Sequence, residues 1–346
     1  ADAARRRMQH QELCAGALHI GHRLRQDRLA IGFVDRTLAD DAFLENVAPG
    51  VYMHRGHTAD IDDAARGDSA NLGVVIGARC VAVIDTGGSL ATGRALRAAI
   101  GKLTDKPVCY VINTHVHFDH VLGNGAFVAA KADKLTDKPV CYVINTHVHF
   151  VAAKAEFVGQ QHLADNLEAS SEFFAENFSA ELEGQHGAAV VVLPMRRVER
   201  EARLDLGQRT LLLEAVARAH TETDMTVLDE KTRTLFSGDL VFRERLPVLD
   251  GSLKGWLAWL QAASGRSYDR VVPGHGPLDE HWPASARTEQ GYLEALLKGT
   301  RDAIAKGIFI EDAKHSVATE ALKGWQLTER VHPLNVSRAF RELEWE

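Results

Sequence analysis

The chain has 346 residues, of which 45% are hydrophobic and 25% are charged, and its formal net charge is −7. This size and composition are typical of a globular protein with one large domain or two modest ones, and the negative charge gives no general reason to bind nucleic acid. No apolar run reaches about 18 residues, so the sequence predicts no membrane-spanning helix.

The sequence pattern divides the chain into three regions. Residues 1–45 show no clear hydrophobic period and are expected to be an N-terminal extension. Residues 46–285 contain the strand-like and motif-bearing segments and are expected to form the main domain. Residues 286–346 are expected to be a C-terminal helical segment that packs on this domain or forms an oligomer contact, because apolar side chains recur there at helical spacing.

The main domain opens with segments that alternate between strand and helix patterns. Residues 71–76 and 81–84 are apolar and flank Gly77-Ala78-Arg79, a combination typical of a β-hairpin. Residues 91–100 have the spacing of a helix. The apolar run of residues 108–112 is expected to form the next strand.

A dense group of metal-competent side chains directly follows that strand. His115, His117, Asp119 and His120 fall within six residues. A strand sends alternate side chains to one face, so His115 and His117 leave the strand on the same side. A helix that begins there would present Asp119 and His120 beside them. Imidazole nitrogens and carboxylate oxygens suit zinc and other borderline first-row metals, and the spacing therefore predicts a metal site.

An exact internal repeat follows this group. Residues 102–118 recur letter for letter at 134–150, which makes residues 133–155 an insertion. An unchanged copy indicates a recent duplication, an engineered feature or a sequence error. The second copy supplies His147 and His149 but lacks the Asp-His pair. We therefore assign the site to the first copy and expect the insertion to leave the domain at the surface. In the alternative arrangement, the second copy replaces the central strand and damages the site.

The next segments return to helix and strand patterns. Residues 161–178 are predicted to be a helix, with Leu163, Leu167 and Phe174 as its core contacts. Residues 190–193 have the apolar character of a strand.

Three further candidate ligands lie downstream, each at the end of a strand-like apolar run. They are His220, Asp239 and His275, and His275 sits within a Gly-His-Gly turn. A rigid scaffold usually presents functional groups where a strand gives way to a loop. In chain order the candidates read His-x-His-x-Asp-His, then His, then Asp, then His.

This ordered set resembles the metallo-β-lactamase superfamily over residues 46–285. The resemblance implies an α/β fold, a four-layer αββα sandwich with a dinuclear zinc site at one edge. It also implies that Asp85 orients a metal ligand by hydrogen bonding, although a simple turn role explains Asp85 equally well. The implied ligand set is His115, His117 and His220 for the first metal, Asp119, His120 and His275 for the second, and Asp239 as the bridge between them.

The resemblance implies an enzyme, a dinuclear zinc metallohydrolase. In this reading a hydroxide that bridges the two zinc ions attacks the carbonyl of an ester, thioester, lactone or β-lactam, and Asp119 orients it or takes up a proton. Asp239 at the bridging position is similar to glyoxalase II-like hydrolases. Residues 113–124 look like the subgroup described as quinoprotein relay system zinc metallohydrolases.

Other functions remain open at this point. A β-lactamase proper is one alternative, and a non-haem iron redox protein or a non-catalytic binding module on the same fold are others. Two Zn²⁺ are the expected cofactors, with iron or manganese as alternatives, and the expected partner is a small-molecule substrate. A homo-oligomer is also an alternative.

The four cysteines give no disulfide or thiolate pattern. Cys14, Cys80, Cys109 and Cys141 include no Cys-x-x-Cys pair. Cys80 and Cys109 lie in strand-like runs and are expected to be free, buried and apolar in behaviour. The sequence leaves the compartment of a soluble protein open between periplasm and cytoplasm.

Overall fold

A computed structural model describes residues 43–128, 155–185 and 191–346. The predicted extension over residues 1–45 lies almost entirely outside the described residues, as does the insertion over residues 133–155 with His147 and His149. The first copy of the repeat is described, and it supplies a central strand and the metal-competent loop, as predicted.

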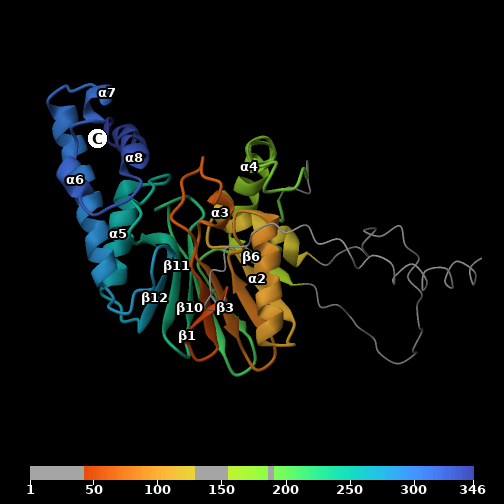
Figure 1. Ribbon diagram of the computed structural model, residues 1–346. Coiled ribbons are helices and arrows are strands. Elements are labelled where there is room, and N and C mark those ends of the chain that lie inside the picture. The colour runs from red at the N-terminus through yellow and green to blue at the C-terminus, as the bar shows by residue number, and fades with distance from the viewer. Residues whose placement is uncertain (1–42, 129–154, 186–190) are drawn as a thin grey trace, which may run out of the picture. The chain divides into compact units, whose positions relative to one another are not determined.

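Two β-sheets form the centre of the fold (Figure 1). The larger sheet contains, in spatial order, β1 (Glu45–Ala48), β2 (Val51–His54), β3 (Leu72–Ile76), β4 (Val81–Ile84), β5 (Val108–Ile112), β6 (Glu156–Gln160) and β7 (Arg196–Val198). The smaller sheet contains β12 (Arg270–His275), β11 (Thr234–Phe242), β10 (Met225–Asp229), β9 (Thr210–Ala215) and β8 (Glu201–Asp205).

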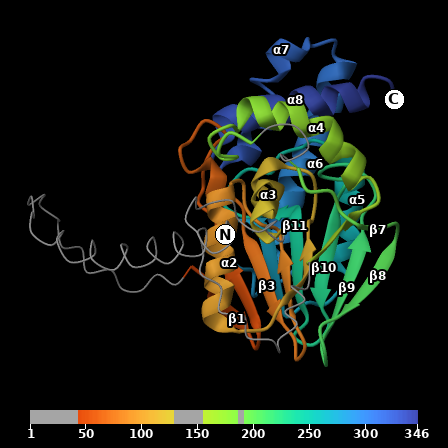
Figure 2. The same ribbon diagram turned by 90° about the vertical axis from the view of Figure 1, so that its right-hand side faces the viewer.

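Helices cover the outer faces of both sheets. Figures 1 and 2 show α2 on the outer face of the larger sheet and α5 and α6 beyond the smaller one. The α/β fold is therefore the predicted αββα sandwich. The helices are α2 (Leu90–Leu103), α3 (Phe118–Val121), α4 (Leu163–Asn177), α5 (Leu253–Ser264), α6 (Ala284–Ala305), α7 (Ile310–Ala313) and α8 (Thr328–Leu343), with 3-10 turns η1 (Arg66–Asp68), η2 (Leu122–Phe127) and η4 (Thr319–Leu322).

Strands β3 and β4 form the predicted hairpin, and both of their faces are buried. Val74 on β3 packs in the apolar layer beneath α2, whereas its neighbour Val75 packs in the layer between the sheets. Val83 and Ile84 on β4 divide in the same way. Because successive side chains alternate between two apolar layers, these strands read as continuous apolar runs.

The predicted helices lie close to their expected positions. Residues 91–100 fall within α2, and residues 161–178 enclose α4. Leu163, Leu167 and Phe174 are buried on α4, as predicted.

The strand predicted over residues 190–193 is wrong for its described part. Val191, Val192 and Leu193 form no ladder, and pairing with β6 begins only at Arg196. Val191 and Leu193 pack toward α4, whereas Val192 packs toward α2. The apolar character that suggested a strand therefore serves packing on both sides, and residues 191–193 pair with no neighbouring strand.

The C-terminal helices form their own apolar layer against α5. Tyr292, Leu293 and Leu296 on α6 are buried together with Trp256 of α5 and Val336 of α8. The division into a main domain and a C-terminal segment stays a prediction. Among the residues that the structure describes, no helix is long and apolar enough to cross a membrane.

A disulfide joins Cys80 and Cys109, so the prediction that both are free is wrong. Cys80 directly precedes β4 and Cys109 lies in β5, and these parallel neighbours pair Val81 with Val108. The two Cα atoms are 5.8 Å apart, which lies within the usual range for a disulfide. The spacing rule failed because the β4–α2–β5 crossover brings together cysteines 29 residues apart.

Loss of this disulfide is expected to lower the free energy of unfolding by about 3–4 kcal/mol, the chain-entropy value for a closed loop of this length. The measurement compares urea unfolding of the wild type and of a Cys80→Ala/Cys109→Ala variant, with and without a reducing agent. The reductant should destabilise the wild type and leave the variant unchanged. Equal stability of the wild type in both conditions would show that the bond does not form.

Candidate metal centre

The seven predicted ligands meet at one edge of the sandwich, where β5, β11 and β12 deliver them. His115 and His117 follow β5, while Asp119 and His120 lie in α3 immediately after. His275 lies at the end of β12, Asp239 lies within β11, and His220 lies in the loop before β10. Both views place α3, α4 and α8 beyond this same edge (Figures 1 and 2).

The side chains fall into two groups that could each hold a metal ion. The first contains His115, His117, His220 and Asp239, and the second contains Asp119, His120 and His275. Within each group, the candidate ligand atoms all lie within 4.8 Å of one another. The sequence had placed Asp239 as a bridge between the groups, and the role of the seven residues as metal ligands stays a prediction.

The carboxylate of Asp239 lies between the two groups. Its Oδ2 is 3.4 Å from His220 Nε2 and 3.7 Å from His115 Nε2, both in the first group. Its Oδ1 is 3.1 Å from His120 Nε2, and its Oδ2 is 3.3 Å from His275 Nε2, both in the second group. Asp239 is therefore the one carboxylate among the seven that reaches imidazoles of both groups.

Each of the five imidazoles is held by one ring nitrogen from outside the centre. The other ring nitrogen faces the remaining candidate ligands, and in His117 and His220 these nitrogens, Nδ1 and Nε2, lie 3.0 Å apart. Where the partner is a carbonyl or carboxylate oxygen, the held nitrogen must carry the proton, because such an oxygen only accepts. The free nitrogen is then the lone-pair donor that a metal requires. The supporting contacts are His115 Nδ1 to Thr114 Oγ1 at 3.0 Å, His117 Nε2 to Asp250 Oδ2 at 3.1 Å, His120 Nδ1 to Asp85 Oδ2 at 2.8 Å, His220 Nδ1 to the Val248 carbonyl at 2.6 Å, and His275 Nδ1 to the Ser69 carbonyl at 2.8 Å.

Several atoms at the centre lack a well-aligned hydrogen bond. Among the described residues, His115 Nε2, His120 Nε2 and Asp239 Oδ1 are buried and make no well-aligned hydrogen bond, although His120 Nε2 and Asp239 Oδ1 lie 3.1 Å apart as an ion pair. A buried polar atom without a partner costs free energy, and such atoms are rare in folded proteins. Cations bound among these three atoms would satisfy all of them together. The residues present therefore fit a metal pair.

Glycines leave the space that the centre needs. A Cβ on Gly274 would collide with Asp239 Oδ1, so only glycine beside His275 lets the carboxylate occupy its position. Gly238 has φ +52, and a Cβ there would meet the side chain of Thr114. The Gly-His-Gly and Gly-Asp pairs in the sequence therefore have a steric cause.

Burial and mutual charge set the protonation of the centre. Burial lowers the pKa of His115 well below its usual value, with repulsion from His120 adding to the effect. Burial also lowers the pKa of His220 to about 3. Both are therefore neutral near pH 7, which is the form that binds metal. Burial opposes the charge on His120 as well, but the nearby carboxylates, led by Asp239, raise its pKa well above the usual range.

The two acidic ligands remain ionised. Burial alone would raise the pKa of Asp239, but the surrounding histidines, led by His275, lower it well below the usual value. Burial would also raise the pKa of Asp119, but the positive charge of His120 and His275 lowers it below the usual value. Ser69 Oγ donates to Asp119 Oδ2 at 2.9 Å and fixes the orientation of this carboxylate.

Asp85 forms the contacts that an orienting residue requires. Its Oδ2 accepts from His120 Nδ1 and from Thr114 Oγ1, and its Oδ1 accepts from the Thr114 backbone N–H. The residue directly follows β4 with φ 56, a left-handed conformation that aspartate adopts more readily than most residues. The turn role and the hydrogen-bonding role therefore coexist.

Three supports of the candidate centre were not identified from the sequence pattern. Asp250, Val248 and Ser69 support the imidazoles or Asp119, as described above. Arg245 lies beside the second group, with Nη1 3.2 Å from His275 Nδ1 and a buried Nε. Its charge contributes to the lowered pKa of Asp119. The position of Arg245 soon after Asp239 is a sequence signal for a contact with an anionic group. A supporting backbone carbonyl, such as that of Val248, leaves no signal in the sequence.

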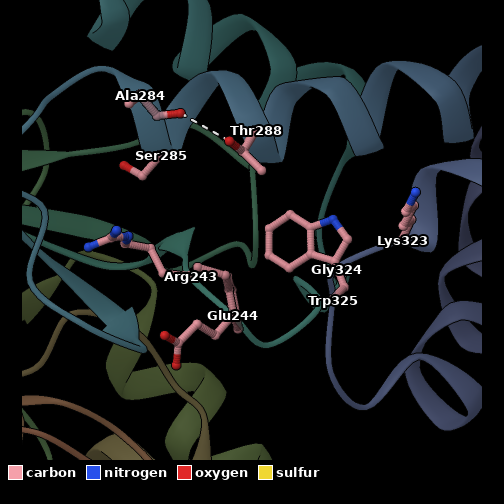
Figure 3. Close-up of a pocket in the computed structure, with 9 residues that line it drawn as sticks. Arg243, Glu244, Ala284, Ser285, Thr288, Lys323, Gly324 and Trp325 are labelled. Atoms are coloured by element: carbon pink, nitrogen blue, oxygen red, sulfur yellow. Dashed lines mark hydrogen bonds between the residues drawn. The ribbon is translucent and has the colours of Figure 1, made fainter.

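A pocket of about 320 Å³ is lined by residues at the end of β11, at the start of α6 and in the segment before α8 (Figure 3). Phe242 lines this pocket and stacks on the His275 ring with centroids 5.1 Å apart. Figure 3 shows Arg243 and Glu244 on one side of it and Trp325 and Lys323 on the other. Phe242 is therefore the residue that lies next to both the pocket and His275.

Known structures share this fold. A sec-alkylsulfatase from Pseudomonas sp. superposes with a TM-score of 0.64 and 17% identity, over 88% of this chain and 51% of that one. A β-lactamase domain protein from Burkholderia ambifaria superposes with a TM-score of 0.62 and 18% sequence identity, over 90% of this chain and 89% of that one. A metallo-β-lactamase from Pontibacter korlensis superposes with a TM-score of 0.51 and 18% sequence identity, over 72% of this chain and 98% of that one. The chain spans about half the length of the alkylsulfatase.

A comparison with curated protein sequences gave no match. The sequence model of one family, described as the Metallo-beta-lactamase superfamily, matches residues 65–275, more than half of the chain, and this range includes all seven candidate ligands. Members of this family are generally hydrolytic enzymes. With its two-sheet sandwich and the ordered ligands at one edge, the chain belongs to the metallo-β-lactamase superfamily.

Proposed function

We propose that the chain is a dinuclear metallohydrolase that cleaves an ester, thioester, lactone or β-lactam bond in a small molecule. The observation that carries this proposal is the convergence of five imidazoles and two carboxylates, with three buried atoms that lack a well-aligned hydrogen bond within the described residues, on one edge of the sandwich. Such a set has no structural purpose without cations, because four of the imidazoles crowd around a single carboxylate.

The two groups have separate roles in this proposal. His115, His117 and His220 would hold the first ion, the second group would hold the second, and Asp239 would bridge them. When bound, two zinc ions would lower the pKa of water toward neutrality and polarise a carbonyl oxygen. Asp239 would screen the repulsion between the cations.

Asp119 is proposed to orient the attacking water and to accept a proton at its Oδ1. Its Oδ2 accepts from Ser69 Oγ and lies 3.4 Å from His275 Nε2, whereas its Oδ1 lies 3.9 Å from His120 Nε2 and accepts no hydrogen bond from Ser69. The lowered pKa of Asp119 keeps it ionised and ready to accept a hydrogen bond at neutral pH.

Arg245 supports a substrate that carries an anionic group. Its guanidinium lies beside His275 and forms no ion pair with any residue in the described ranges. An unpaired, partly buried guanidinium at a reaction centre is suited to a carboxylate or sulfate oxygen. A sulfate ester is therefore a second candidate substrate, beside the carbonyl compounds.

The test is a metal analysis followed by a hydrolysis panel on the metal-loaded protein. The panel contains thioesters, lactones, β-lactams, phosphodiesters and an alkyl sulfate ester. We expect about two metal ions per chain and turnover of at least one class. His115→Ala should abolish that turnover because it removes a ligand of the first ion, and His281→Ala, at an exposed histidine outside the centre, is the control.

Each other result contradicts the proposal in a recognisable way. Full turnover by His115→Ala would place the reaction elsewhere. Bound iron with a visible absorption band and no hydrolysis would favour the redox alternative. Absence of both metal and turnover in the wild type would favour a binding module.

The compartment is proposed to be oxidising. The Cys80–Cys109 disulfide supports the periplasm over the cytoplasm, because cytosolic thiols are normally kept reduced.

A further inference from the structure

The loop of residues 246–250, called here the support loop, holds two imidazoles of the first group. The carbonyl oxygen of Val248 accepts from His220 Nδ1 at 2.6 Å. The carboxylate Oδ2 of Asp250 accepts from His117 Nε2 at 3.1 Å. The position of this loop therefore decides where two of the three imidazoles of the first group direct their free nitrogens.

Helix α8 fixes the backbone of the support loop on both sides of Val248. The buried amide of Asn335 donates to the Pro247 carbonyl at 2.7 Å and accepts from the Leu249 N–H at 2.9 Å. The same amide nitrogen lies 3.0 Å from the Tyr292 hydroxyl on α6. One side chain thus ties the loop to two helices of the C-terminal layer.

The same helix also holds Asp250. Arg338 Nη2 pairs with Asp250 Oδ1 at 2.8 Å, and its Nη1 donates to the Leu249 carbonyl at 2.6 Å. The two carboxylate oxygens of Asp250 therefore face different partners, Arg338 on one side and His117 on the other. Hydrogen bonding to His117 lowers the pKa of Asp250, and the nearby charge of Arg338 also lowers it.

These contacts serve only the first group. The second group is supported from other parts of the fold, with His120 held by Asp85 after β4 and His275 held by the carbonyl of Ser69. A displacement of α8 would therefore disturb one metal position and leave the other in place.

We propose that Asn335 and Arg338 of α8 are positioning residues that set the metal affinity of the first group through the support loop. This inference rests on the proposed function, because it takes the first group to hold a metal. Partners that orient a metal-binding histidine typically change metal affinity by about 10–100-fold when they are removed. The C-terminal helix thereby controls how much of the dinuclear form exists at a given metal concentration.

The test measures the affinity of each metal position by chelator competition with Zn²⁺, and by the absorption spectrum of the Co²⁺-substituted protein. In the wild type two ions bind. In Asp250→Ala the first-group ion should bind about 10-fold or more weakly, while the second-group affinity stays unchanged. Arg338→Gln should weaken the same ion, and Arg338→Lys should restore part of the loss because it keeps the charge. These losses appear in metal binding, apart from any assay of activity.

A double variant separates positioning from general loosening of the helix. If Arg338 acts through Asp250, the Asp250→Ala/Arg338→Gln protein should lose no more affinity than Asp250→Ala alone. Glu342→Gln is the matched control on α8. Glu342 docks the helix on Ser252 and Leu253 at the start of α5 but touches neither Val248 nor Asp250.

Three results would overturn the inference. The first is a first-group affinity that stays at the wild-type value in Asp250→Ala and Arg338→Gln. The second is an equal loss of first-group metal affinity in Glu342→Gln. This would mean that any weakened contact between α8 and the rest of the fold lowers the affinity to the same extent. The third is a wild type that binds no metal, which would end the proposed function together with this inference, whereas the first two leave the proposed function intact.

Discussion

Replacing Asp239 by Asn is expected to remove both metal ions and to abolish hydrolysis. The carboxylate of Asp239 lies 3.1 Å from His120 Nε2 and 3.3 Å from His275 Nε2, and it also reaches the first group. An amide of the same shape supplies one oxygen without charge and turns an NH₂ toward an imidazole nitrogen. The loss of affinity should exceed the roughly 100-fold upper value for a residue that only supports a ligand.

The measurement is metal content after dialysis against a defined concentration of free Zn²⁺, with turnover of the substrate found in the panel. Asp279→Asn is the control for placing an amide at a buried carboxylate. Asp279 is 2% exposed and Asp239 is 4% exposed, but Asp279 hydrogen-bonds only to Ser285 and to backbone N–H groups. An Asp239→Asn protein that keeps two ions would show that the bridge is not a ligand.

The local part of this centre could be predicted because its signal is compact. His115, His117, Asp119 and His120 follow one strand, and strand alternation alone directs two of them to the same side. The distant ligands His220, Asp239 and His275 were placed through their order along the chain and the family it resembles. The structure brings all seven within two groups, although metal binding itself stays a proposal.

The supports of the centre could not be predicted because each partner is remote in sequence and ordinary in type. Asp250 lies 133 residues from His117, and Ser69 lies 206 residues from His275. An aspartate before a glycine reads as a turn, and a carbonyl acceptor exists at every residue. Only the folded arrangement shows which turn faces which imidazole.

The sequence pattern also does not show which segments lie next to each other in a sheet. Cys80 and Cys109 were assigned as free because the spacing rule looks along the chain, whereas the bond forms across two parallel strands. Residues 191–193 have the burial of a strand without a partner to pair with. In both cases the prediction was wrong because the neighbouring segment, which the local pattern does not show, decided the outcome.

Replacing Glu289 by Gln is expected to stabilise the protein at neutral and alkaline pH. Glu289 on α6 is fully buried, its Oε2 accepts from the Phe242 N–H at 3.4 Å, and its Oε1 has no partner among the described residues. Burial raises its pKa well above the usual 4.5, and the Asp239 carboxylate also raises it. The folded protein therefore holds a proton on Glu289 at pH values where the unfolded chain has released it.

The sign of the effect follows from this difference in bound protons. Because the folded pKa is the higher one, stability from Glu289 is complete below about pH 4.5 and falls as the pH rises toward the folded value, by about 1.4 kcal/mol per pH unit. Glutamine imitates the protonated acid and does not titrate. The difference in unfolding free energy between Glu289→Gln and the wild type should thus be near zero at pH 4 and grow with pH.

Urea unfolding at a series of pH values checks this expectation, with Glu294→Gln as the control on an exposed turn of the same helix. The control should show no pH-dependent gain, because its side chain is exposed to solvent in the folded protein. A flat difference for Glu289→Gln would mean that a cation compensates this carboxylate in the folded protein. The expected slope would instead identify α6 as a helix whose contact with strand β11, which carries Asp239, is weakened by a buried acid. It would also give a variant in which the candidate centre can be studied on a more stable fold.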